Sequence, residues 1–231
     1  MAVKSPGLTP LHEHSLKVIL DNQNEGGGYL ACPVMPDYQF SWFRDGAFIA
    51  YALTVDGTLN PIPHAVGRNA QWDSADRFHR WCARMINSRA AAIERTIARA
   101  ANGEPLVLAD TLNARYQLHG DPGPDDWPEF QLDGPAIWLW SLTKYVDVCR
   151  VRPLPLEWEQ AVELTARYLA AIWQSPCNDC WEERGTEVHV STLAAIFAGL
   201  NAAEYLVPRL NFSAVKDTIQ KFIFAQGITP G

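Results

Sequence analysis

The stretch AQWDSADRFHRWCARMINSRAAAIERTIARAA, from Ala70 to Ala101, decides the fold class of this chain. Its apolar residues recur at helical spacing, and its cluster of Arg and Glu is typical of a solvated face. Outward from it, similar patterns predict helices over residues 11–24, 44–55, 134–149, 156–173, 187–206 and 211–225. About seven helices and no convincing sheet indicate an all-α protein, and helix pairs joined by alternating loops favour a toroid or solenoid.

Between these helices, the sequence predicts three long loops. Asp56-Gly57 and the Pro-rich stretch to Pro63 predict a loop after the second helix. Residues 102–128 form a connection with little periodicity, and residues 175–185 form another loop rich in polar and aromatic residues. A connection as long as residues 102–128 is uncommon within a compact domain and is often functional.

Composition narrows the classes of protein that this chain can represent. With 231 residues and 48% hydrophobic residues, residues 1–231 are expected to form a single domain with a real core. The net charge of −7 disfavours a nucleic-acid partner, which would require clustered Lys and Arg. No apolar run is long enough to span a bilayer, and residues 1–10 lack the apolar core of a signal peptide, so we expect a cytoplasmic protein without membrane contact.

The five cysteines are odd in number and scattered, which is not the pattern of a disulfide framework. Cys177 and Cys180 form the single C-x-x-C pair, and His189 is the only further zinc ligand candidate near them. A structural zinc site would need about two more ligands. We therefore interpret the pair as ordinary loop thiols, and the sequence predicts no metal and no cofactor.

Charged residues stand beside aromatic residues in three stretches that each precede a predicted helix. The stretches contain Trp42, Phe43, Arg44 and Asp45, then Trp127, Gln131 and Asp133, then Trp181, Glu182, Glu183 and Arg184. Aromatic rings offer apolar faces for stacking, and fixed charges hydrogen-bond to hydroxyls, so the combination favours a carbohydrate site. If the helices alternate in direction, these loops share one end of the bundle and their charges converge on one pocket.

Each stretch also fits a purely structural role. Arg44 and Asp45 fit a local ion pair with a helix cap, and Asp133 fits an N-cap. Trp127 fits a loop anchor on the core, and the two glutamates after Trp181 fit a solvated charge pair. A helical scaffold whose tryptophans all belong to the core is therefore one open hypothesis.

Glu182 has the surroundings that a glycosidase acid requires. Glycoside hydrolysis needs a carboxylic acid that protonates the leaving oxygen. Apolar surroundings or a neighbouring carboxylate favour the protonated form of such a group. Trp181 and Glu183 place one influence on each side of Glu182.

At these residues the chain resembles the glucoamylase-type glucosidases, glycoside hydrolase family 15. The likeness lies in QFSWFRDG (39–46), DWPEFQLDG (126–134) and CWEERG (180–185), which follow the order and rough spacing of the family. Two shorter segments, ARY (114–116) and HVST (189–192), are similar to its bacterial members. The resemblance implies an (α/α)6 toroid, of which about half is present here, and inversion at the anomeric carbon of α-glucosides.

The resemblance also implies roles for single residues. By position, Arg44 and Asp45 match the family's binders of the non-reducing-end sugar, and Trp127 matches an aromatic residue that lines the subsite. Glu182 matches the general acid, and Glu183 a neighbour that contacts substrate. The candidate catalytic residue is thus Glu182, and the candidate substrate-binding residues are Trp42, Arg44, Asp45, Trp127, Asp133, Glu183 and Arg184.

The chain departs from the family at the general base, which relatives carry as a Glu late in the domain. No carboxylate here matches it, so we expect the chain to be the N-terminal portion of an exo-acting inverting α-glucosidase. A C-terminal half or a partner chain would complete the toroid, and an α-glucoside or maltooligosaccharide would be the substrate. The alternative is a catalytically incomplete glucan-binding or regulatory module of the same fold.

Overall fold

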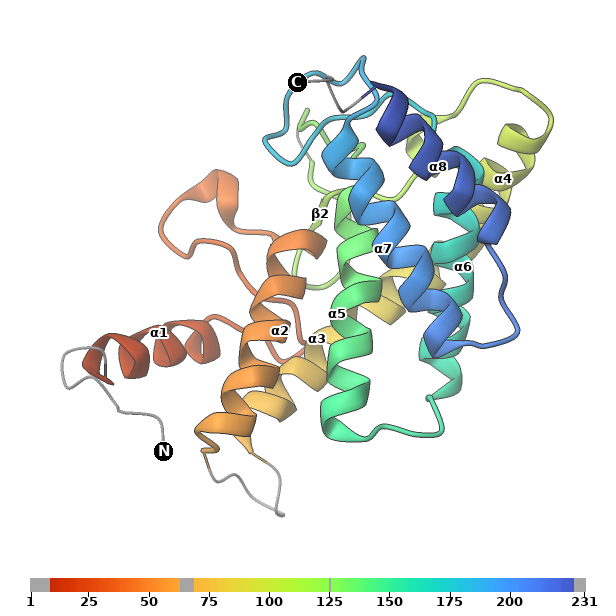
Figure 1. Ribbon diagram of the computed structural model, residues 1–231. Coiled ribbons are helices and arrows are strands. Elements are labelled where there is room, and N and C mark those ends of the chain that lie inside the picture. Colours follow the sequence, from red (N-terminus) through yellow and green to blue (C-terminus); the bar gives the residue numbers. More distant parts are fainter. Residues whose placement is uncertain (1–8, 63–68, 125, 227–231) are drawn as a thin grey trace, which may run out of the picture.

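The computed structural model describes residues 9–62, 69–124 and 126–226, and these residues form eight α-helices (Figure 1). The helices are α1 (Thr9–Asp21), α2 (Phe43–Leu59), α3 (Ala70–Ser88), α4 (Ala90–Ala101), α5 (Asp133–Cys149), α6 (Leu156–Ile172), α7 (Val190–Leu206) and α8 (Ser213–Gln226). Two 3-10 turns, η1 (Pro36–Tyr38) and η3 (Leu108–Asp110), lie in the connections. The all-α prediction is confirmed.

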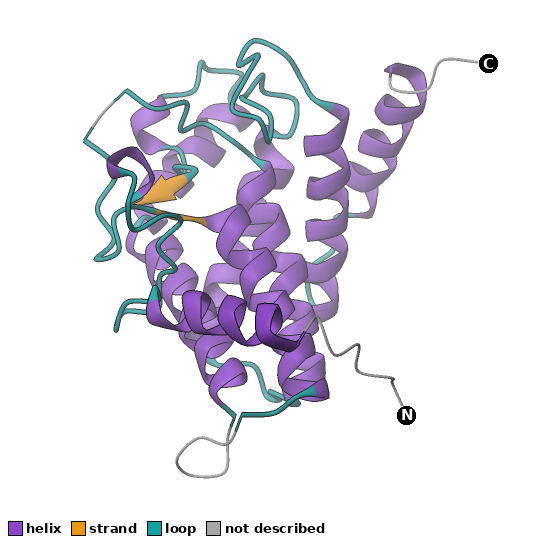
Figure 2. Cartoon of the chain, turned by 90° about the vertical axis from the view of Figure 1, so that its left-hand side faces the viewer, coloured by secondary structure: helices purple, strands orange, loops and turns teal. Residues whose placement is uncertain are grey.

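Three helices, α2, α5 and α7, stand side by side and begin at the same end of the molecule (Figure 1). Helices α3 and α6 pack behind them, and α8 packs against α7. Because α2, α5 and α7 are parallel, the loops that precede them gather at one end, as Figure 2 shows. The expected convergence of loops at one end of the bundle is therefore present.

A short antiparallel ladder ties two of these loops together. Strand β1 (Ser41–Trp42) pairs with β2 (Arg115–Tyr116), with Trp42 opposite Arg115. The ladder leads directly into α2, and Phe43 N donates a further hydrogen bond to Ala114 O at 3.2 Å. The long connection of residues 102–128 is thus anchored against the start of α2.

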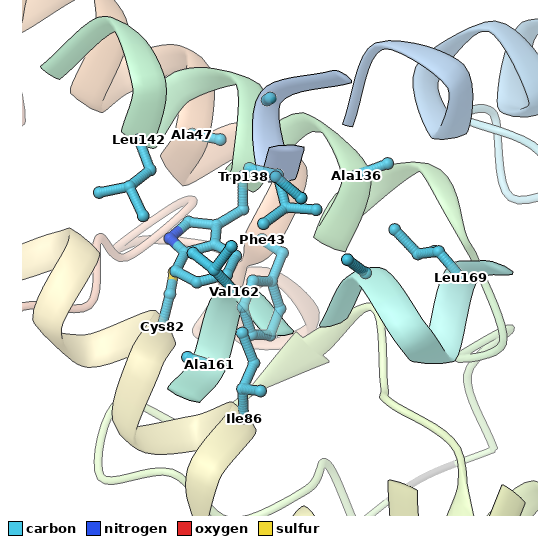
Figure 3. Close-up of a cluster of buried hydrophobic side chains, with 14 of the residues drawn as sticks. Phe43, Ala47, Cys82, Ile86, Ala136, Trp138, Leu142, Ala161, Val162 and Leu169 are labelled. Carbon is cyan, nitrogen blue, oxygen red and sulfur yellow. The ribbon is translucent and has the colours of Figure 1, made fainter. Parts of the chain in front are cut away.

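The core between the helix layers is aromatic and fully buried. Trp138 of α5 lies among Phe43 of α2, Cys82 of α3 and Val162 of α6, and Figure 3 shows its indole at the centre of this group. Each of these side chains has no exposed surface. Because a buried aromatic side chain removes a large apolar area from water, this group contributes strongly to stability.

The predicted helix over residues 70–101 is interrupted at Arg89, which separates α3 from α4. Its backbone leaves helical geometry, with φ −101° and ψ 11°. The Arg89 guanidinium donates hydrogen bonds to the carbonyls of Ala109 and Thr111. The connection between α4 and β2 is therefore fastened to this bend, a tertiary contact that the helical spacing did not reveal.

The loop predicted to start at Asp56-Gly57 begins later, because α2 continues to Leu59. The Asp56 carboxylate accepts a hydrogen bond from Gln71 Nε2 at 3.0 Å. Gly57 leaves room for Trp72, whose ring would lie 2.5 Å from an added Cβ. Packing against α3 thus keeps the Asp-Gly pair helical, against its turn preference. The other end of that predicted loop, Pro63, lies outside the described residues.

Within the described residues, no helix has the length and apolar character that a membrane span requires. Residues 1–10, which were predicted to lack a signal-peptide core, lie mostly outside the part of the chain that the structure describes.

Replacing Gly199 with Ala tests the close packing of α5 against α7. An added Cβ would lie 2.9 Å from the backbone oxygen of Ala136, which cannot move without shifting α5. We expect Gly199→Ala to lower the free energy of unfolding by about 1–3 kcal/mol. Alanine favours helices over glycine by about 1 kcal/mol, so a gain in stability in urea denaturation would contradict the proposed contact.

Candidate active site

An open cavity of about 210 Å³ lies where α2 begins. It is lined by Ala31, Tyr38, Trp42, Arg44, Asp45, Cys180, Trp181 and Glu182. The lining thus joins the segment before and at the start of α2 to the loop before α7. Three aromatic side chains, two carboxylates and a guanidinium meet in it, which is the chemistry expected of a sugar-binding pocket.

One carboxylate oxygen of Glu182 is fixed by donors from two distant segments. Trp42 Nε1 donates a hydrogen bond to Glu182 Oε1 at 3.0 Å, and Gln131 Nε2 donates to the same atom at 3.2 Å. Arg44 Nη2 lies 3.9 Å from it. Glu182 Oε2 has no hydrogen-bond partner in the part of the chain that the structure describes. The side chain is therefore oriented through one oxygen and leaves the other available.

Arg44 joins the first turns of α2 and α5. Its Nη1 donates to Gln131 Oε1 at 2.8 Å and to Asp133 Oδ2 at 3.0 Å. Burial opposes the charge of Arg44, but the hydrogen bond and charge of Asp133, together with the charges of Asp45 and Glu182, outweigh it, so the pKa of Arg44 is raised. No ion pair between Arg44 and Asp45 is present among the described residues, so the local-pair interpretation is wrong. Asp133 is the first residue of α5, after the N-cap Leu132, so the N-cap interpretation is wrong too.

Asp45 lies in the first turn of α2 and opens into the cavity. The residue keeps exposed surface at the open cavity, but the surrounding groups partly desolvate its carboxyl, and this desolvation raises the pKa of Asp45. Arg44 acts in the opposite direction, and the charges of Glu182 and Asp133 raise the pKa further. The site thus disfavours the ionisation of Asp45 relative to a carboxyl in water.

The loop that carries Glu182 is shaped by Asp179. The Asp179 carboxylate accepts hydrogen bonds from the backbone N–H groups of Trp181 at 2.9 Å and Glu183 at 3.1 Å. Glu182 between them has a left-handed backbone, with φ 65°. This tight turn directs the side chain of Glu182 toward Trp42, while Trp181 remains 79% exposed at the cavity.

The sequence missed two contributions to this site. Asp179 stands two residues before Trp181, and an Asp that bonds to backbone N–H groups ahead of it is a known turn signal. Tyr38 lines the cavity and stacks on Trp42, with ring centroids 5.9 Å apart. An aromatic residue four positions before Trp42 was the signal for it.

The structure places the predicted site residues in two groups. The cavity lining includes Trp42, Arg44, Asp45 and Glu182 but does not include Trp127, Asp133, Glu183 or Arg184. Trp127 packs edge-to-face against Trp42, with centroids 5.9 Å apart, and Asp133 is buried beneath Arg44. Glu183 and Arg184 are exposed, and their substrate contacts stay predictions. The hypothesis that every tryptophan is core is wrong, because Trp181 is exposed.

His189 fastens the loop before α7. Its Nε2 lies 2.9 Å from Cys177 O and 3.1 Å from Arg184 O, so this nitrogen carries a proton and donates. Burial raises the pKa of the Cys177 thiol to about 11. Within the described ranges, no group of three or more His, Cys, Asp or Glu residues has the arrangement of a metal site.

The raised pKa of Asp45 predicts a pH-dependent effect of Asp45→Asn. The folded protein binds a proton at Asp45 more readily than the unfolded chain does, so this carboxyl's contribution to stability falls as the pH rises from about 3.8 through the raised value. An Asn at this position does not titrate, so its contribution to stability does not change with pH. In urea denaturation, the stability of Asp45→Asn relative to the wild type should therefore increase between about pH 4 and about pH 7. A constant difference over that range would contradict the assigned environment.

Arg184 is exposed and has a left-handed backbone, with φ 51°. The left-handed region costs about 1–2 kcal/mol for a residue with a Cβ, and the extra freedom of glycine offsets about 0.5–1 kcal/mol of that. Arg184→Gly should therefore raise the free energy of unfolding by about 0.5–1 kcal/mol. The matched control is Glu183→Gly, because Glu183 is the adjacent residue and has no positive φ. This variant should lower the free energy of unfolding by about 0.5–1 kcal/mol. Equal effects of the two variants would refute the assigned turn.

Comparisons with known proteins agree on one family. The family model of the glycosyl hydrolases family 15 matches residues 13–230. Isomaltose glucohydrolase of Kribbella flavida is 35% identical over 200 residues, which cover 84% of this chain and 48% of that protein. A glycosidase variant in complex with glucose has a TM-score of 0.80 at 30% identity, over 99% of this chain and 60% of that one.

The glucoamylase of Saccharomycopsis fibuligera shows the same fold at 17% identity, with a TM-score of 0.66 over 94% of this chain and 47% of that one. The predicted fold, about half of a glucoamylase-type toroid, is confirmed. This chain spans about half the length of the curated relative that resembles it at 35% identity. The family model and the isomaltose glucohydrolase match both extend over most of the chain, which therefore belongs to the glycosyl hydrolases family 15.

Proposed function

We propose that this chain carries the acid side of the active site of an inverting, exo-acting α-glucosidase. The substrate would be a terminal α-glucosidic bond of an oligo- or polysaccharide, such as a maltooligosaccharide. Family membership supports a glycosidase, and one relative is named for the hydrolysis of isomaltose.

The observation that carries the proposal is the fixed carboxyl of Glu182 at the cavity. Trp42 and Gln131 hold Oε1, so a proton on Oε2 would be presented in one direction. A positioned general acid contributes about 10²–10⁴-fold to the rate of such a reaction. Glu182 is therefore proposed as the acid that protonates the glycosidic oxygen.

Arg44 and Asp45 are proposed to hold the terminal sugar. The pairing of Arg44 with Gln131 and Asp133 uses Nη1 and leaves N–H groups on Nη2 and Nε for sugar hydroxyls. Asp45 presents carboxylate oxygens to the same cavity, and Trp42 and Tyr38 supply ring surface. Holding one sugar by such groups aligns its glycosidic oxygen with the acid.

The general base is proposed to come from outside this chain. Inversion requires a second carboxylate about 6.5–9.5 Å from the acid, with a water between them. Two relatives of which this chain covers 48% and 60% support a contribution from further residues. That part would be a C-terminal half of the same protein or a partner chain.

An exposed apolar stripe indicates where these further residues would pack against the chain. On α2, Phe48 is 50% exposed and Leu59 is 71% exposed, and on α7 Tyr205 is 52% exposed. The Phe48 ring lies 6.1 Å from Trp140 of α5, so the stripe crosses from one helix to the next. Apolar stripes of this kind mark surfaces that other segments cover. Further helices are proposed to pack along α2, α5 and α7.

The variant Glu182→Gln tests the acid in the protein as it is naturally produced. An amide keeps the hydrogen-bonding shape but has no acidic proton, so kcat on maltose or isomaltose should fall by about 10²–10⁴-fold. Binding of maltooligosaccharides or acarbose, followed by quenching of tryptophan fluorescence, should survive. Near-normal turnover would refute the assignment.

The matched control is Glu187→Gln, an exposed glutamate of the same loop that lies outside the cavity, which should keep wild-type turnover. Sugar binding without glucose release by the wild-type protein would instead favour the glucan-binding module. Absence of both binding and release would refute a carbohydrate function altogether.

A further inference from the structure

The guanidinium of Arg115 is buried directly behind the candidate site. Its side chain has no exposed surface, although it carries a full charge. Nε donates to Glu129 Oε1 at 2.9 Å, and Nη1 donates to Asp37 O at 3.2 Å. A charge is costly to bury unless it is paired and hydrogen-bonded, so such a costly group in this place requires a reason.

Aromatic rings contact the guanidinium on more than one side. Arg115 Cζ lies 4.1 Å from the centroid of the Phe40 ring, 4.2 Å from that of Trp127 and 5.7 Å from that of Trp42. A cation over a ring is attracted to its negative face, and the planar guanidinium also stacks on it. Trp127, which does not line the cavity, thus lies between Arg115 and the ring of Trp42, which it meets edge-to-face.

Arg115 is connected to both donors that fix Glu182. Trp42, the first donor, lies opposite Arg115 in the β1–β2 ladder, and its ring is one of those that surround the Arg115 guanidinium. The second donor, Gln131, follows two residues after Glu129. Glu129 accepts hydrogen bonds from Arg115 through both carboxylate oxygens, one from Nε and one from the backbone N at 3.1 Å.

We propose that Arg115 is a positioning residue for Glu182, acting through Trp42 on one side and through the Glu129–Gln131 segment on the other. This inference rests on the proposed function of Glu182 as the acid. Arg115 lies outside the cavity lining, so it sets the direction of the acid and leaves the grip on the terminal sugar to Arg44 and Asp45. Loss of Arg115 therefore affects turnover more than substrate binding.

Lysine cannot replace arginine in this arrangement. The ammonium of lysine is a compact point charge, whereas the guanidinium supplies separate donors to Glu129 and Asp37 and a plane for two rings. Arg115→Lys keeps the charge and removes that geometry. It is therefore a sharper test than removal of the charge.

The experiment measures kcat and KM of Arg115→Lys in the protein as it is naturally produced. A shift of about 1 Å in a reacting group can cost about 100-fold, so kcat should fall by at least about tenfold. KM should change by less than about threefold, because the proposed sugar-holding groups are untouched. The near-ultraviolet circular dichroism band that disappears in Trp127→Phe should weaken in Arg115→Lys, because the indole loses its support.

The matched control is Arg167→Lys, which disrupts a two-bond pair with Glu94 between α6 and α4, away from the cavity, and should leave all three readouts unchanged. If Arg115→Lys does not fold, Phe40→Leu removes one stacking ring without breaking a hydrogen bond. It should lower kcat about two- to fivefold at a similar KM.

Wild-type kcat together with an unchanged dichroism band in the folded Arg115 variant would overturn the proposal. So would a loss of activity that follows the unfolded fraction, since that is a purely structural effect. If the wild-type protein hydrolyses no α-glucoside, the proposed function fails. Positioning of Glu182 as an acid then falls with it, and the dichroism band alone decides whether Arg115 holds the indoles.

Discussion

The parallel packing of α2, α5 and α7 is the constraint on which the site depends. Small residues set the distance between these helices. Gly134 lies beside the Cβ of Phe43, and Gly199 lies against Ala136, so α5 is close to both neighbours. Ser141 adds a buried hydrogen bond from its hydroxyl to Ala47 O at 2.7 Å. Because the helices are parallel and close, their first turns meet, and groups far apart in sequence become neighbours.

This convergence brings together more negative than positive charge. Asp45, Asp133 and Glu182 surround a single guanidinium, Arg44, in the described part of the site. The N-termini of α2 and α5 add partial positive charge beside Asp45 and Asp133. Asp133 is the carboxylate that lies closest to Arg44, while the pKa of Asp45 is raised. Of these carboxyls, Asp45 is thus the one whose ionisation the site disfavours.

Sequence reasoning predicted the helices and the loops of this site but not its contacts. Helical spacing reports which face of a helix is apolar, and this was enough for the all-α class. The hydrogen bond from Trp42 to Glu182 joins residues 140 positions apart, and no local pattern encodes it. The two-residue strands β1 and β2 are too short to show alternation, so the ladder that aligns Trp42 with Arg115 had no signal.

Because local patterns do not encode such contacts, the sequence placed the neighbours Glu182 and Glu183 in one site, whereas the structure places only Glu182 at the cavity. Glu182 and Glu183 are adjacent, yet the left-handed backbone of Glu182 turns the first toward Trp42, while Glu183 is exposed. A side chain such as that of Asp179 can impose this turn because it bonds two N–H groups at once. A residue with a Cβ adopts such a backbone at a cost of about 1–2 kcal/mol. The turn persists because the bonds of Asp179 and those of Glu182 to Trp42 and Gln131 together oppose that cost, so the strain and the orientation of the carboxyl are parts of one arrangement.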